Sequence, residues 1–325
     1  MKRFKYLVFL VFLVGCVIIS SQAFADKVYF TMGGAGAQGR WYAEVSFFAK
    51  LITENIPNVT ASGVVSPGVS RGNIKRIGNM ELQGGRCFGT DFYNAYNRKP
   101  PLDEKDYGVT AWFMGPKLIM RCIAAPSVKS IKDLKGKKIG VGVRGSGDDE
   151  LAINLLKHYG LSEKDVKLQF VGRKVAQNSF ANHQIDAILI IYTRNNHRHL
   201  GPVFSARPVG KSAHFVPFEM SDLRGFVKKY PFLGLDTGGE PDFKTPNLNA
   251  VYVPTMLALH KTVDASLAYQ MTKLIMTNWD QVTAALPWWT PDEVTPGTAA
   301  KIPGVTPQMF HPGALKYYKE AGVIK

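Results

Sequence analysis

The residue types best suited to chemistry stand in the turn Arg144-Gly145-Ser146-Gly147. The apolar segment 138–143 before this turn predicts a strand, and the spacing of Leu151 and Leu155 after it predicts an amphipathic helix. A glycine turn between a strand and a helix leaves backbone N–H groups free to bind an anion. Ser146 adds a hydroxyl and Arg144 a fixed cation. A plain connecting turn that binds nothing is the alternative interpretation.

Two acids, Asp148 and Asp149, follow in the first turn of the predicted helix. They suit the positive end of the helix dipole but would repel a polyphosphate, and the Gly-Lys-Ser/Thr ending of a nucleotide P-loop is missing. We therefore expect a small carboxylate as the ligand. Asp148 also offers a partner for an amino group, a hypothesis that favours an amino acid over a keto acid.

A second glycine-rich loop, residues 33–39, leads into a predicted helix. Its Gly34-x-Gly36-x-x-Gly39 spacing formally matches a dinucleotide fingerprint, but no acidic residue follows at the required distance, and we reject that interpretation. Arg40, like Arg144, offers a carboxylate a bidentate fork; a solvated cation at the lip of the cleft is the alternative for both. Trp41 either walls the pocket or begins the core face of its helix. The expected ligand contacts at this helix entrance are Gly39, Arg40, Trp41 and Tyr42.

Other polar and aromatic residues at element ends are candidate ligand contacts. Ser70 and Asn73 either contact the ligand or cap the local turn. Asp91 begins a predicted helix, and Tyr192 follows the buried strand 185–191. The histidines of the 197–199 segment have no nearby cysteine or acid cluster, so we interpret them as part of a solvated loop rather than a metal site. We expect no cofactor and no metal.

The order of the predicted elements defines the fold class. Strands and helices alternate, and uninterrupted apolar strands predict α/β structure with a parallel sheet covered on both faces. Extended segments at 117–125 and 250–259 bracket the second α/β block. We therefore predict two α/β lobes joined by two crossing strands, with lobe 1 formed by 26–122 plus 248–325 and lobe 2 by 123–247. Because ligands bind at the carboxyl ends of strands, both glycine turns are expected to face one cleft.

The first 25 residues predict a cleaved secretory signal. Lys2, Arg3 and Lys5 precede an apolar run, and Ala23-Phe24-Ala25 suits a signal peptidase. A bacterial lipoprotein box ending at Cys16 is the competing interpretation. No later segment reaches the apolar length of a membrane span, about 20 residues. We expect the mature chain in the periplasm.

Composition and charge limit the partners. The sequence is 46% hydrophobic and 20% charged, which is typical of a globular protein. Its formal charge is +15, and loss of the three signal cations leaves +12. The lysines and arginines are scattered and no nucleic-acid motif is present, so the charge indicates attraction for anionic solutes. Cys87 and Cys122 remain in the mature chain, and the sequence leaves a disulfide between them open.

Four motifs resemble those of the TAXI family, the solute receptors of one branch of the TRAP transporters. The first is the glycine loop before Trp41-Tyr42, where Arg40 and Trp41 depart from the family pattern. The motifs that follow it are Gly68-x-Ser70-x-x-Asn73 with Thr90-Asp91; Leu134-Lys135-Gly136-Lys137 with Gly145-Ser146-Gly147 and Gln184-Ile185-Asp186-Ala187; and His311-Pro312-Gly313-Ala314 with Tyr317-Tyr318. Asp148 stands where the family usually has threonine.

This resemblance implies a type II periplasmic binding protein fold. It also implies a monomeric receptor that captures a glutamate-like amino acid or a dicarboxylate and delivers it to TRAP membrane permease subunits. A periplasmic sensing module for a membrane signalling protein is the alternative, followed by an enzyme on the same two-lobe fold. The enzyme alternative lacks support, because the sequence has no nucleophile elbow, paired carboxylates or zinc signature.

Overall fold

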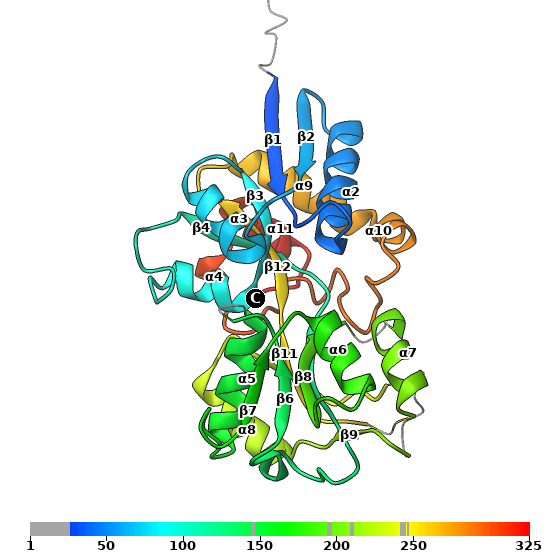
Figure 1. Cartoon of the computed structure of the whole chain (residues 1–325). Helices are drawn as coiled ribbons and strands as arrows, with labels where there is room; N and C mark the ends of the chain where they lie inside the picture. Colours follow the sequence, from blue (N-terminus) through cyan, green and yellow to red (C-terminus); the bar gives the residue numbers. More distant parts are fainter. Residues whose placement is uncertain (1–26, 145–146, 194–196, 209–210, 241–244, 246) are drawn as a thin grey trace, which may run out of the picture.

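A computed structural model of the chain describes residues 27–144, 147–193, 197–208, 211–240, 245 and 247–325. In these residues the strands form two separate sheets, each at the centre of one lobe (Figure 1). The predicted signal peptide, Gly145 and Ser146 lie outside the described residues.

The sheet of lobe 1 has the order β2-β1-β3-β12-β4. Its strands are β1 Val28–Gly33, β2 Val59–Val64, β3 Gly84–Phe88, β4 Val109–Met114 and β12 Thr255–His260. The sheet of lobe 2 has the order β10-β11-β5-β8-β6-β7, and β9 also pairs with β5. Its strands are β5 Leu118–Ala124, β6 Lys138–Val141, β7 Lys167–Phe170, β8 Ala187–Tyr192, β9 His214–Val216, β10 Gly234–Asp236 and β11 Ala250–Val253.

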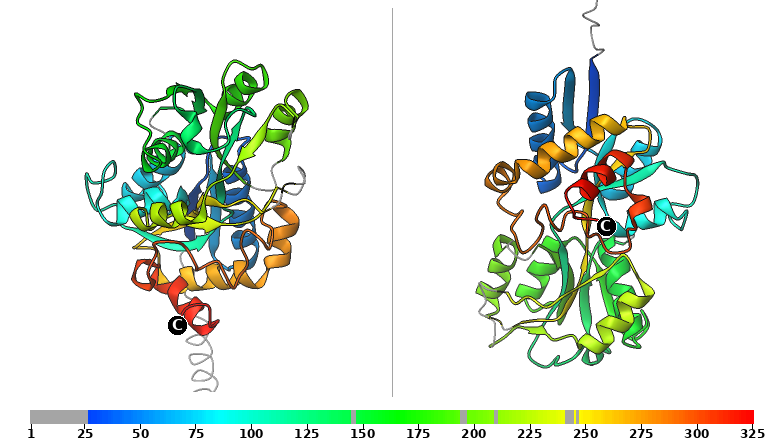
Figure 2. Two further views of the ribbon diagram at one scale, coloured as in Figure 1. Left: turned by 90° about the horizontal axis from the view of Figure 1, so that it is seen from below. Right: turned by 180° about the vertical axis from the view of Figure 1, so that it is seen from behind.

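Helices cover both lobes, and the C-terminal helices return to lobe 1 (Figure 2). Lobe 1 carries α2 Arg40–Asn55, α3 Val69–Gly78, α4 Gly89–Tyr96, α9 Ala265–Thr277, α10 Trp279–Ala285 and α11 Pro312–Glu320. Lobe 2 carries α5 Gly147–His158, α6 Arg173–Ala181, α7 His197–Ala206 and α8 Met220–Lys229. Short 3-10 helices span Ile131–Leu134 and Pro307–Met309.

The crossing strands make both sheets mixed rather than parallel as predicted. β1 runs parallel to β2 and β3, and β6 runs parallel to β7 and β8. In contrast, β12 is antiparallel to β3 and β4, and β5 is antiparallel to β8 and β11. The antiparallel strands are those that pass between the lobes or return from them.

The chain passes between the lobes at residues 115–117 and at Pro254, whereas the predicted lobe boundaries were at 122/123 and 247/248. β4 ends at Met114 in one sheet and β5 starts at Leu118 in the other. On the return, only Pro254 separates β11 from β12. The strands of lobe 2 therefore run from 118 to 253, whereas the predicted lobe 2 was 123–247. Gly115-Pro116-Lys117 interrupts the apolar sequence at the first crossing and Pro254 at the second. Both strands on either side of each crossing are apolar, so hydrophobicity alone does not show that they belong to different sheets.

A buried polar cluster holds the two crossings together. The Thr255 hydroxyl donates to the Pro116 carbonyl at 2.7 Å and accepts from Arg86 Nη2 at 2.6 Å. Arg86 Nε lies 2.8 Å from Glu44 Oε2, and both side chains are at most 2% exposed. Burial lowers the pKa of Arg86, while the Glu44 charge opposes that shift. The junction therefore depends on one desolvated ion pair.

The apolar strand β8 is buried on both faces, which explains its uninterrupted hydrophobic sequence. Leu189 and Ile191 face the core beneath α5 and α8. Ile188 and Ile190 face the opposite core beneath α6 and α7. This alternation confirms the prediction of an α/β layer covered on both sides.

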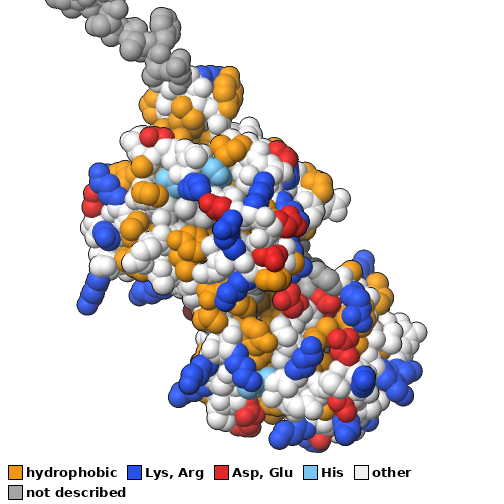
Figure 3. Space-filling model, turned by 90° about the vertical axis from the view of Figure 1, so that its left-hand side faces the viewer, with side chains coloured by type: hydrophobic (Ala, Val, Ile, Leu, Met, Phe, Trp, Pro, Cys, Tyr) orange, Lys and Arg blue, Asp and Glu red, His pale blue; other side chains and the backbone are white. Residues whose placement is uncertain are grey.

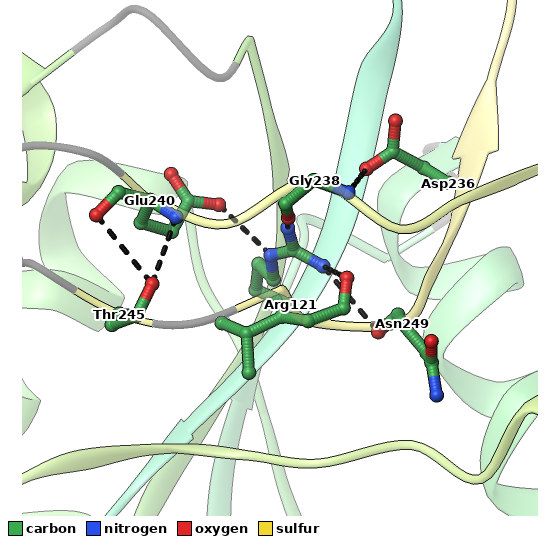
Figure 4. Close-up of polar contacts among 7 residues, drawn as sticks. Arg121, Asp236, Gly238, Glu240, Thr245 and Asn249 are labelled. Atoms are coloured by element: carbon green, nitrogen blue, oxygen red, sulfur yellow. Dashed lines mark hydrogen bonds and ion pairs between the residues drawn. The ribbon is translucent and has the colours of Figure 1, made fainter.

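A second buried ion pair organises the Pro/Gly-rich segment before β11. Arg121 on β5 donates through Nε to Glu240 Oε1 at 2.9 Å and through Nη2 to the Gly238 carbonyl at 2.7 Å (Figure 4). Its Nη1 also reaches the carbonyl of Asn249 at 3.4 Å. The segment is thus anchored by one arginine from a distant strand, which local sequence signals could not reveal.

The C-terminal helices begin after polar residues. Asn278 separates α9 from α10, and its side-chain amide donates to the Leu274 carbonyl at 2.8 Å. The last helix, α11, begins at Pro312, and His311 Nδ1 accepts from the Gly313 N–H. In the described part of the chain, no helix is long and apolar enough to cross a bilayer.

Cys87 and Cys122 are buried and free, and they belong to different sheets. This answers the question that the sequence left open. Burial raises the pKa of both thiols, so neither is a reactive thiolate in the folded chain.

Candidate ligand-binding site

A cavity of about 440 Å³ lies between the two lobes. The molecular surface narrows at this junction, where acidic and basic side chains lie side by side (Figure 3). Lobe 1 supplies Gly68, Val69, Ser70, Arg71, Phe88 and Asp91, and lobe 2 supplies Gly142, Val143, Gly147, Asp148, Gly172 and Arg173. The volume suits a small organic molecule.

Four helices begin at this cavity. Val69 and Gly147 are the first residues of α3 and α5, Phe88 precedes α4, and Gly172 precedes α6. None of the caps described for α3, α4 and α6 has a side-chain hydrogen bond to the helix end. The first N–H of α4, that of Gly89, already donates to the Pro254 carbonyl at 2.8 Å. The other N–H groups of these first turns, together with the helix dipoles, favour an anion in the cavity.

The start of α3 is conformationally unusual. Gly68 has φ of 76° and Val69 has φ of 49°. A β-branched residue in the left-handed region is strained, and such strain is typical of binding sites. Val69 is also 39% exposed, and Val143 on lobe 2 is 55% exposed. Both lobes therefore present an apolar side chain at the cavity.

Arg71 links the lobe 1 wall to lobe 2. Its Nε lies 2.9 Å from Asp91 Oδ1, and its Nη2 lies 2.8 Å from Glu150 Oε2 on α5. Burial by itself lowers the pKa of Arg71, but the two carboxylates outweigh it and raise that pKa. Asp91 is held further by the Ser70 hydroxyl, which donates to Oδ2 at 2.5 Å.

Arg173 forms the corresponding cation on the lobe 2 wall. Its Nε and Nη2 donate to the two oxygens of Asp148 at 2.6 and 2.9 Å. The Arg173 side chain is 41% exposed and that of Asp148 is 12% exposed. The carboxylate orients the guanidinium, and the cavity has a fixed cation on each side.

Four of the predicted site residues line this cavity: Ser70, Asp91, Gly147 and Asp148. They come from both lobes, but Ser70 and Asp91 belong to neither of the two glycine turns that were expected to face one cleft. Gly145 and Ser146 lie outside the described residues.

The predicted residues of the first glycine loop lie beside the cavity rather than along it. Gly39 precedes α2, and Arg40 Nη1 donates to the Thr193 hydroxyl of lobe 2 at 2.7 Å while its guanidinium covers Trp288. The Trp41 ring packs edge-on against Phe88, a cavity residue, at 5.0 Å between centroids. Tyr42 packs against the core of lobe 1.

The remaining predicted residues have other contacts. Asn73 is fully buried and donates to the carbonyls of Gly33, Gly34 and Arg86. The Arg144 guanidinium stacks 3.5 Å from the Phe170 ring centroid, and its side chain is 63% exposed. Tyr192 is 4% exposed in the lobe 2 core, and burial raises its pKa.

Sequence reasoning missed both cavity guanidiniums. Arg173 follows Gly172 after β7, which is the same strand–glycine–helix pattern that drew attention to Arg144. Arg71 directly follows Ser70 in a motif already singled out. Both signals were therefore present in the sequence. The described residues contain no cluster of metal-ligating side chains.

The chain belongs to the NMT1-like family, whose model matches residues 32–322. Its fold is that of type II periplasmic binding proteins, as the resemblance implied, and similar solved structures share it. PhnD1 from Prochlorococcus marinus in complex with methylphosphonate has a TM-score of 0.53 at 10% identity, covering 92% of this chain and 100% of that one.

Two further structures are similar over most of their length. A putative sulfonate ABC transporter periplasmic sulfonate-binding protein from Methylobacillus flagellatus has a TM-score of 0.54 at 14% identity, covering 92% of this chain and 96% of that one. A protein from Xanthomonas citri bound to chloride ion has a TM-score of 0.54 at 12% identity, covering 91% and 97%. At these identities the likeness establishes the fold.

Proposed function

We propose that the chain is a periplasmic solute receptor that captures a small organic anion between its lobes and delivers it to a membrane transporter. The observation that carries this proposal is the convergence of four helix N-termini and two guanidiniums on one cavity between two lobes. Hinged lobes of this kind close around a ligand. The family membership and the methylphosphonate complex of a protein with the same fold support this assignment.

For the ligand, the sequence resemblance favours a carboxylate such as a glutamate-like amino acid or a dicarboxylate. The names of the similar structures favour a sulfonate or a phosphonate. A thermal-shift series of the mature protein with these classes distinguishes them. A ligand that binds only the folded state adds about 2.7 kcal/mol at a hundredfold excess over its dissociation constant. Absence of a shift with every anion tested would overturn the proposal.

For the transporter, we propose TRAP permease subunits on the basis of the sequence resemblance. An ABC-type transporter is the second candidate, because one protein of similar fold is described as a component of such a system. Uptake of labelled ligand by cells that keep their ATP while the ion gradient is collapsed separates the two. TRAP uptake stops under this condition, whereas ATP-driven uptake continues.

The receptor assignment also predicts that the ligand is not consumed. Recovery of the intact ligand after prolonged incubation with the protein supports a receptor. Turnover of the ligand would support the enzyme alternative instead.

A further inference from the structure

The ion pairs described at the cavity join two guanidiniums to three carboxylates. Arg71 pairs with Asp91 and Glu150, and Arg173 pairs with Asp148. In these pairs the carboxylates therefore outnumber the guanidiniums by one.

The remaining attraction for an anion comes from the helix ends. Each N-terminus contributes the equivalent of about half an elementary charge, and this effect is confined to the first turn. Asp91 and Asp148 offset part of this field, so the net attraction for an anion is weak, and it grows only in proportion to the ligand charge. The cost of removing the ligand from water grows with the square of its charge, so a second negative charge adds more cost than attraction.

Glu150 is the acid in this set whose ion pair joins the two lobes. It belongs to α5 in lobe 2, whereas its partner Arg71 belongs to α3 in lobe 1. Its side chain is 52% exposed, while that of Asp91 is 5% exposed. Glu150 can therefore be changed without leaving a buried charge unpaired, because Arg71 keeps Asp91.

We propose that the cavity selects singly charged organic anions over doubly charged ones. In this proposal Glu150 determines the selection, because it adds a second carboxylate to Arg71 and so gives the cavity three carboxylates for two guanidiniums. The inference rests on the proposed function, because it concerns the ligand of the same cavity. The apolar side chains of Val69, Phe88 and Val143 leave room for the organic part of such a ligand.

Ethyl sulfate and ethyl phosphate provide a test with two ligands of similar shape. The sulfate carries one charge, and the phosphate carries nearly two at pH 8 because its second ionisation lies near pH 6. Calorimetric titration of the full mature chain at low salt measures both dissociation constants. We expect the wild type to bind ethyl sulfate at least tenfold more tightly.

The variant Glu150→Gln should bind both ligands more tightly and the phosphate disproportionately so. For charges about 8 Å apart at an effective dielectric of about 40, removal of one carboxylate changes affinity roughly fivefold per ligand charge. The preference for sulfate should therefore shrink roughly fivefold. A loss of lobe closure would weaken the binding of both ligands equally. The ratio of their two dissociation constants therefore separates charge selection from a structural role of Glu150.

Glu163→Gln is the matched control, since Glu163 is a 42%-exposed acid on lobe 2 that pairs with Arg144 rather than with a cavity residue. This variant should leave the ratio unchanged. Equal or tighter binding of the phosphate by the wild type would overturn the inference, as would an unchanged ratio in Glu150→Gln. If neither ligand nor any other small anion binds, the proposed function itself fails and this inference with it.

Discussion

Arg173 and Asp148 form a two-point ion pair on the lobe 2 wall of the cavity, with N–O distances of 2.6 and 2.9 Å. Both residues line the cavity, and both lie at helix starts, α6 and α5 respectively. The pair fixes the plane of the guanidinium before a ligand arrives, which reduces the ordering cost of binding.

Replacement of Arg173 should therefore impair ligand binding. Arg173→Gln removes the cation and leaves Asp148 uncompensated in the cavity, so we expect affinity for the best anion to fall at least tenfold, since a hydrogen bond to a charged group contributes about 1.5–3 kcal/mol. Arg173→Lys keeps the charge but loses the planar fork, and its affinity should be intermediate. Isothermal titration measures both. Arg144→Gln is the control, and a comparable loss there would instead support the sequence prediction that Arg144 contacts the ligand.

The same pair bears on the hypothesis that Asp148 recognises an amino group. Glutamate and 2-hydroxyglutarate differ by one net charge, so loss of the Asp148 carboxylate should by charge alone shift the preference towards the hydroxy acid roughly fivefold. Because both Asp148 oxygens already bind Arg173, we expect Asp148→Asn to give no larger shift than this. Competition binding gives this ratio directly. A shift well beyond fivefold towards the hydroxy acid would restore the amino-group hypothesis.

The ion pair at the crossing strands should dominate the stability of the junction. Glu44→Gln leaves the Arg86 charge buried without its partner, and such changes cost about 3–5 kcal/mol. Glu54→Gln breaks an exposed pair with Lys50, 59% and 71% exposed, and should cost less than about 0.5 kcal/mol. Urea unfolding of both variants measures the difference. Equally small losses of unfolding free energy in both variants would mean that other groups compensate the buried charge of Arg86.

The stability of the protein should fall as the pH drops below neutrality. Burial lowers the pKa of His311 in the folded chain, so the folded state favours the neutral ring. This contribution is complete above the unfolded pKa, near 6.5, and is lost as the pH falls through the lower folded value.

The variant His311→Asn tests this, because it keeps a side-chain acceptor at the start of α11 but does not titrate. Unfolding free energies at pH 7.5 and 5.0 should therefore drop less in this variant. An equal drop would place the effect on His214 or His260, whose pKa values burial also lowers.

The fold followed from the sequence because its signals are local. The repeat of Leu151 and Leu155 predicted α5, and the uninterrupted run of β8 predicted a strand buried on both faces. The points at which the chain passes between the lobes were predicted less accurately. The apolar sequence of β5 starts at Leu118, before the predicted boundary at 122, and the change of sheet depends on pairing with distant strands.

The cavity could be predicted only in part. Arginine follows or stands in a glycine turn at Arg40, Arg144 and Arg173, and the sequence gives no reason to rank them. Their contacts separate them, because Arg144 stacks on Phe170 and Arg40 on Trp288, whereas Arg173 lines the cavity between the lobes. Which helix ends meet at one cavity is a property of the whole fold.

Each lobe contains one buried thiol whose alkylation rate can report the opening of that lobe. Cys87 lies in the lobe 1 sheet and Cys122 in the lobe 2 sheet, and both are fully shielded from solvent. An alkylating reagent reaches either one only when that sheet opens, so the labelling rate at each cysteine follows the unfolding of its own lobe. Mass spectrometry of the labelled peptides can therefore show which lobe opens first, and whether ligand closure couples the two, without any introduced probe.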